Sequence, residues 1–152
     1  MMKRGHILLE ILCTVALVSV FTTLAVVGVG ETKTKIQRRQ LEMAARRFIM
    51  DCRAVQQRNM FAESDEGWRI TITDNSDKYT FGKGGGVVET HHLSDSGCDG
   101  VIFKGNALDS IRFTGTGSVD DEKSILLMHR DNESLILTLN LQPVTGRIEI
   151  SN

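Results

Sequence analysis

Three histidines in the second half of the chain could bind a metal ion. His91 and His92 are adjacent, and His129 follows. Their imidazoles would form a metal site only if the fold brought carboxylates or Cys98 beside them. Adjacent residues of a strand point to opposite faces, so the pair cannot act from one face. We therefore expect no metal site here.

Two further runs could hold a ligand. The acidic run 120–122 could attract calcium, but it lacks the alternating ligands of a dedicated loop and is better explained as an exposed turn. The glycine-rich run 81–86 lacks the spacing and the closing Lys-Ser/Thr of a phosphate-binding loop, so it predicts a hairpin turn. No Gly-x-Ser-x-Gly element and no convincing Ser/His/Asp group is visible. We expect a non-enzymatic protein without a cofactor.

One carboxylate, Glu10, lies inside an apolar run that begins at His6. Residues 11–30 carry no charge and would cover roughly 30 Å as a helix, the thickness of a bilayer core. A retained anchor fits this length better than a secretory signal, whose apolar region has about 7–15 residues. An acidic side chain in such a helix costs on the order of 2.5 to 3.5 kcal/mol, so it marks a paired or functional site unless it lies near the headgroups.

Periodicity predicts a second helical half at 31–62. This range has no proline or glycine, and its apolar positions recur at three- and four-residue spacing, which is typical of an amphipathic helix. Together with the apolar half it would form a helix of roughly 80 Å. The predicted buried stripe consists of Leu41, Ala44, Ala45, Phe48, Cys52, Val55 and Asn59.

Short alternating runs separated by turn residues follow the helix, and they predict strands. An antiparallel sheet or a small β-sandwich packed on the helix would bury their apolar faces. The predicted strands are 68–73, 78–81, 86–89, 100–104, 110–113, 124–129, 134–141 and 146–150.

Charge is unevenly distributed, although the chain as a whole has a formal charge of only -1. Residues 31–62 carry eight basic side chains against three acidic ones, a local charge of +5. Residues 63–152 carry fifteen acidic side chains against eight basic ones, a local charge of -7. An acidic domain repels phosphate, so binding of nucleic acid by the β-rich part is disfavoured.

The amino-terminal residues 3–10, Lys-Arg-Gly-His-Ile-Leu-Leu-Glu, with the apolar run that follows, resemble the class III signal of type IV pilins and pseudopilins. In that family a prepilin peptidase cleaves after the glycine, and the new amino terminus is N-methylated. The resemblance implies a leader at 1–5, cleavage between Gly5 and His6, methylation at His6, and a glutamate at the fifth mature position, Glu10. His6 stands where the family usually has phenylalanine, and no proline occurs near position 27.

The spacing also gives Glu10 a physical role. A mature amine at His6 and a carboxylate at Glu10 lie about one helical turn apart. In a filament, Glu10 of an incoming subunit could therefore pair with the amine of a subunit already assembled, which would favour one register. Residues 111–150 also resemble, loosely, the second half of minor pseudopilin H proteins.

The resemblance implies a pilin-like α+β fold with a leader at 1–5, a transmembrane half at 6–30, an amphipathic half at 31–62 and a β-rich domain at 63–152. It implies a single-pass protein of the bacterial inner membrane with a cytoplasmic amino terminus and a periplasmic or extracellular domain. The basic residues that follow the apolar run would favour the opposite orientation on charge alone. Implied partners are other pilins or pseudopilins, the prepilin peptidase and the assembly platform.

Several interpretations stay open. A minor pseudopilin of a type II secretion system is the leading one, and a competence or DNA-uptake pilin is its alternative. A membrane-anchored sensor or binding module is a more distant alternative, and it predicts no cleavage at Gly5. Cys52 and Cys98 could form a disulfide outside the cytoplasm, or both could be buried free thiols.

Overall fold

The computed structural model describes residues 3–62, 67–105 and 110–151, without the side chains of residues 3–8 and 24–31. The chain divides into two compact units, Met1–Ile36 and Gln37–Asn152. The division falls within one continuous helix, α1 (Lys3–Met60). Residues 1 and 2 of the predicted leader lie outside the described residues, and so does residue 63, where the β-rich domain is predicted to begin.

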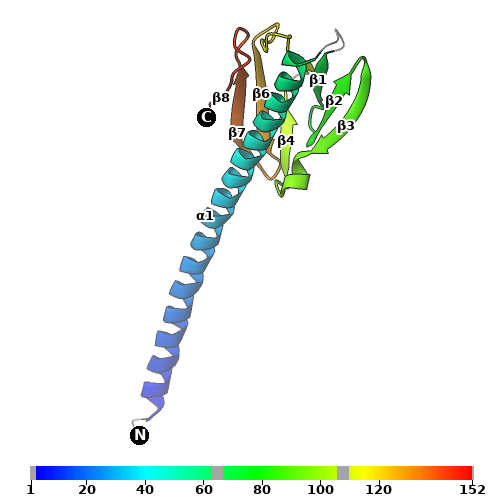
Figure 1. Cartoon of the computed structure of the whole chain (residues 1–152). Helices are drawn as coiled ribbons and strands as arrows, with labels where there is room; N and C mark the ends of the chain where they lie inside the picture. The colour runs from blue at the N-terminus through cyan, green and yellow to red at the C-terminus, as the bar shows by residue number, and fades with distance from the viewer. Residues whose placement is uncertain (1–2, 63–66, 106–109, 152) are drawn as a thin grey trace. The chain divides into compact units, whose positions relative to one another are not determined.

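Two antiparallel four-stranded sheets form the rest of the second unit (Figure 1). The strand order is β3-β2-β1-β5 in one sheet and β4-β6-β7-β8 in the other. All eight predicted strands are present, with ends that differ by a few residues. Their bounds are β1 Trp68–Ile72, β2 Lys78–Lys83, β3 Gly86–His92, β4 Val101–Lys104, β5 Ser110–Arg112, β6 Lys123–His129, β7 Asn132–Leu141 and β8 Ile148–Ser151, with a short 3-10 helix η1 at Leu93–Ser96.

The predicted apolar stripe of α1 is the part of the helix that enters the core. Each of its members is buried, and the apolar members belong to one hydrophobic cluster with residues of both sheets. The periodicity therefore identified the correct face of the helix. The buried members are Leu41, Ala44, Ala45, Phe48, Cys52, Val55 and Asn59.

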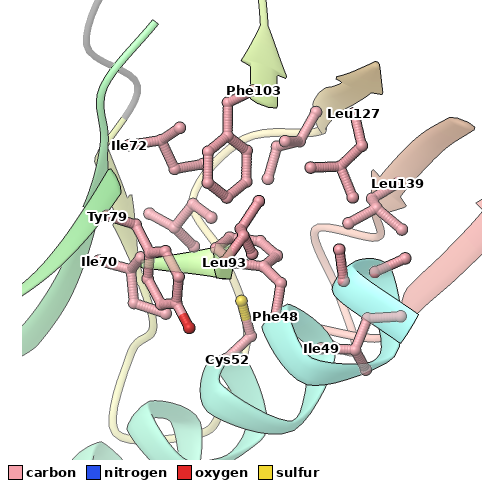
Figure 2. Close-up of a cluster of buried hydrophobic side chains, with 14 of the residues drawn as sticks. Phe48, Ile49, Cys52, Ile70, Ile72, Tyr79, Leu93, Phe103, Leu127 and Leu139 are labelled. Carbon is pink, nitrogen blue, oxygen red and sulfur yellow. The ribbon is translucent and has the colours of Figure 1, made fainter. Parts of the chain in front are cut away.

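Phe48 joins the helix to both sheets (Figure 2). Its ring is fully buried and lies 5.3 Å from the ring of Tyr79 on β2 and 5.2 Å from that of Phe103 on β4, both edge to face. Such aromatic pairs add about 0.5–1.5 kcal/mol beyond the burial of their area. The Tyr79 hydroxyl donates to the carboxylate of Asp51 on α1. Burial and this carboxylate raise the pKa of Tyr79.

Asn59, near the end of α1, ties the helix to the first sheet. Its amide nitrogen donates to the carbonyl oxygens of Trp68 and Phe113, both at 2.8 Å. Its amide oxygen accepts from the Trp68 backbone N–H at 2.6 Å. A single side chain thus satisfies three backbone groups at the start of β1 and just past the end of β5, in the way that a neighbouring strand would.

Gln56 makes a second connection, to two loops at one end of the second sheet: the loop that precedes β6 and the loop between β7 and β8. Its amide nitrogen donates to the Gly117 carbonyl at 2.6 Å and to the Thr145 carbonyl at 3.4 Å. Gly146 follows with a φ of 61°, and a Cβ there would overlap the Gly117 carbonyl oxygen. Glycine is required at this position because both the dihedral angle and the close backbone approach exclude a side chain.

The hairpin predicted at the glycine-rich run connects β2 to β3. Gly84 and Gly85 have φ values of 56° and 92°, as the two-residue turn of a tight hairpin requires. β3 is an edge strand, and Val87 and Val88 are 67% and 59% exposed. Its free edge is the longest among the edge strands of the two sheets.

Replacing Asn59 by alanine should destabilise the protein by about 2–4 kcal/mol, because it leaves three backbone groups of the first sheet without their partner. Urea denaturation of the full chain in detergent, followed by tryptophan fluorescence, measures the difference. The exposed neighbour Gln57, changed to alanine, serves as the control and should change stability by less than about 0.5 kcal/mol. Equal midpoints for Asn59→Ala and the parent would show that the amide is not a structural tie.

Candidate assembly surface

The amino-terminal half of α1 exposes a continuous apolar surface. Eight large apolar side chains between residues 9 and 21 are each more than half exposed, and they lie all around the helix. A helix that is apolar on every face needs a lipid or protein environment. The side chains are Leu9, Ile11, Leu12, Val15, Leu17, Val18, Val20 and Phe21.

The hydroxyl groups in this segment are satisfied by the helix itself. Thr14 donates to the Ile11 carbonyl at 2.8 Å, and Ser19 donates to the Ala16 carbonyl at 2.7 Å. The hydroxyls of Thr22 and Thr23 donate to backbone carbonyls three or four residues earlier. Because these groups need no water, the segment can enter an apolar environment without the cost of an unmade hydrogen bond.

Glu10 is the exception in this apolar surface. Its side chain is exposed, and no described residue pairs with it. Gly5 and His6 lie on the same helix, but the side chain of His6 is outside the described residues. The structure thus places the three predicted processing and registration residues on one helix. Cleavage, methylation and registration remain predictions.

Among the residues that the structure describes, no helix is both long enough and apolar enough to cross a membrane. Within the predicted transmembrane half 6–30, the side chains of residues 6–8 and 24–30 are not described.

The candidate metal ligands are not brought together. His91 stacks on Tyr79 with ring centroids 5.5 Å apart, and its Nε2 lies 3.0 Å from a Glu89 oxygen without the geometry of a hydrogen bond. His129 is buried, and its Nδ1 accepts from the Asp131 backbone N–H at 3.2 Å. The acidic run 120–122 is exposed. Within the described part of the chain, no group of three or more ligands could hold a metal.

His92 instead belongs to a small polar network around Asp77. The Asp77 carboxylate accepts from the Ser94 hydroxyl at 2.7 Å and lies 3.3 Å from His92 Nδ1. Burial works to raise the pKa of Asp77, but the hydrogen bonds from Ser94 and His92 and the charge of His92 outweigh it and hold the pKa below its usual value. A backbone hydrogen bond adds to the network, because the Leu93 N–H donates to the Asp77 carbonyl at 3.0 Å. The network fastens η1 to the start of β2.

The two cysteines that could have paired are free thiols in the structure. Cys52 lies inside the core (Figure 2), where burial and the nearby Asp51 raise the pKa of its thiol. Cys98 is also buried, its pKa is raised by burial and by Asp99, and its thiol donates to the Ser96 carbonyl at 3.7 Å. The raised pKa favours the protonated form of each thiol, which is the less reactive form.

Comparison with solved structures identifies the fold. Two crystal structures of the type IV minor pilin FimU from Pseudomonas aeruginosa strain PAO1 resemble this chain at 14% identity. One has a TM-score of 0.56 and covers 76% of this chain and 90% of its own; the other has a TM-score of 0.52 and covers 74% and 93%. No family model and no curated protein matches the sequence. The chain has the pilin-like α+β fold, as predicted.

The Asp77 network makes stability depend on pH. A depressed carboxyl pKa stabilises the folded state above the unfolded pKa of about 3.9, and this stabilisation is lost as the pH falls through the lower folded pKa. Urea midpoints measured from pH 6 to pH 2 should therefore fall less steeply for Asp77→Asn than for the parent. Asp121→Asn, at an exposed position whose side chain has no hydrogen bond or ion pair to a described residue, should keep the parental slope. Parallel slopes for Asp77→Asn and the parent would contradict the role of the network.

Proposed function

We propose that this chain is a minor pilin-like subunit, a pseudopilin, of a short envelope-spanning filament that serves protein secretion. The observation that carries the proposal is the combination of a pilin-like fold with an amino-terminal helix half that is apolar on every face and carries one unpaired carboxylate, Glu10. Such a helix needs partners outside its own chain. Helices of neighbouring subunits and the lipid of the inner membrane would supply them.

Processing by a prepilin peptidase would prepare the chain for assembly. Cleavage between Gly5 and His6 would remove the leader 1–5, and methylation would follow at His6. The chain would then be held in the bacterial inner membrane by residues 6–30, with its amino terminus cytoplasmic and its β-rich domain outside the membrane. Other pilin-like subunits and an assembly platform would be its partners.

Secretion is favoured over uptake of DNA because of charge. The β-rich part carries a formal charge of -7, which repels phosphate. In addition, Arg147 at the β8 end of this domain is paired with Glu149 at 3.4 Å. A DNA-binding surface built around Arg147 would leave this arginine free to contact phosphate.

Co-expression with a prepilin peptidase should shorten the chain by its first five residues and add a methyl group to His6. Intact-mass spectrometry measures both changes. A Gly5→Val variant should keep the leader, because a branched side chain replaces the glycine that the peptidase is expected to recognise. A parent chain that retains its leader in the presence of active peptidase would favour a membrane-anchored binding module instead.

Changing Glu10 to Gln should leave insertion and cleavage intact but reduce co-purification with partner subunits by about tenfold or more, because the buried amine of the neighbour loses its counter-charge. Glu10→Asp, which keeps the charge, should retain part of the binding. Glu42→Gln removes a carboxylate from the second half of the helix and should bind normally. Normal recovery of Glu10→Gln with its partners would refute the registration role.

A further inference from the structure

The face of α1 that points away from the core carries a defined stripe. We call Arg39, Met43, Arg46, Met50 and Arg53 the outer stripe, and all five side chains are exposed. At about 100° per residue they fall within an arc of about 80°. That arc is centred opposite the buried stripe around Phe48 and Cys52, which point into the core in Figure 2.

The two methionines give the outer stripe an apolar component. Met43 is 49% exposed and Met50 is 62% exposed, and they are seven residues apart. Methionine is adaptable and polarisable, and it is enriched at binding surfaces together with arginine. The pair therefore indicates a contact surface rather than a face that is built only for water.

The three arginines of the outer stripe differ from the other arginines of the helix half. Arg38 pairs with Glu42 at 3.5 Å, and Arg47 pairs with Asp51 at 3.5 Å. Arg58 lies over the ring of Trp68, 4.7 Å from its centroid. In contrast, Arg39, Arg46 and Arg53 form no ion pair and no ring contact with any described residue.

The spacing of these groups defines the kind of partner. Arg39, Arg46 and Arg53 repeat every seven residues, and so do Met43 and Met50, which is the repeat that a second packed helix requires. Guanidinium groups are matched by carboxylates and by phosphates. The exposed methionines on the same seven-residue repeat favour a helix that carries carboxylates over a phosphate backbone, because they need an apolar partner. A second copy of this helix half would instead set arginines against arginines, and its local charge of +5 would repel.

We propose that the outer stripe binds an amphipathic helix of a different subunit, one with an apolar centre and acidic residues at seven-residue intervals. The inference rests on the proposed function in taking the partner to be another subunit of the filament. The chemistry of the partner follows from the stripe itself.

A synthetic peptide tests the proposal on the full chain in detergent micelles. The probe is a helical peptide of about three heptads with one leucine and one glutamate in each heptad. Fluorescence anisotropy at low salt should give tighter binding for this peptide than for the same peptide with glutamine or lysine in place of glutamate. Equal binding of the glutamate and glutamine peptides would overturn the proposal.

Two triple variants with the same loss of charge provide the matched comparison. Arg39→Gln, Arg46→Gln and Arg53→Gln together should weaken binding of the glutamate peptide by about tenfold. Arg38→Gln, Arg47→Gln and Arg58→Gln together should stay within about threefold of the parent, because these arginines already have partners. An equal loss of affinity in both triple variants would show a general attraction of the peptide to a basic helix. It would refute the outer stripe as the binding surface.

Sedimentation velocity and processing separate this proposal from the others. The full chain should not self-associate through the outer stripe. Self-association that the first triple abolishes would identify a second copy as the occupant and overturn the proposal. Both triples should be cleaved after Gly5 at the parental rate. Failure of cleavage in the parent would count against the proposed function while leaving the peptide result valid.

Discussion

The fold depends on one helix that buries a single stripe against two sheets at once. Phe48 is the centre of this contact, because its ring meets Tyr79 of one sheet and Phe103 of the other. Fixing that ring fixes the rotation of the helix about its own axis. The direction of every outward-facing residue of the second helix half is then set as well, including the exposed arginines and methionines of the outer stripe.

Periodic features of the fold could be predicted from the sequence, and pairing features could not. The stripe from Leu41 to Asn59 and the eight strands could be predicted from the spacing of apolar residues. Burial on one face makes apolar residues recur about every 3.6 residues in a helix and every 2 residues in a strand. The strand order β3-β2-β1-β5 rests on contacts between distant residues. For the same reason Asn59 was predicted as a buried position, but its bonds to Trp68 and Phe113 were not.

For the candidate sites too, some features could be predicted from the sequence and others depend on the three-dimensional structure. Gly5, His6 and Glu10 were predicted from a resemblance to the pilin signal, and their predicted partners are other molecules, which a single chain does not contain. The net charge of the second helix half was countable from the sequence. Which arginines are neutralised depends on geometry, although the i,i+4 spacing of Arg38 with Glu42 and of Arg47 with Asp51 carried that signal.

The side-chain amides at the end of α1 have a mechanical consequence. A tension applied along the helix reaches the sheets through the buried stripe and also through Asn59 and Gln56. The hydrogen bonds of these two amides hold Trp68 of β1, Phe113 just past β5, and the loops at Gly117 and Thr145. Several bonds loaded together resist extension better than bonds that break one after another. The carboxyl-terminal end of the helix is therefore held to the domain by hydrogen bonds as well as by its buried stripe.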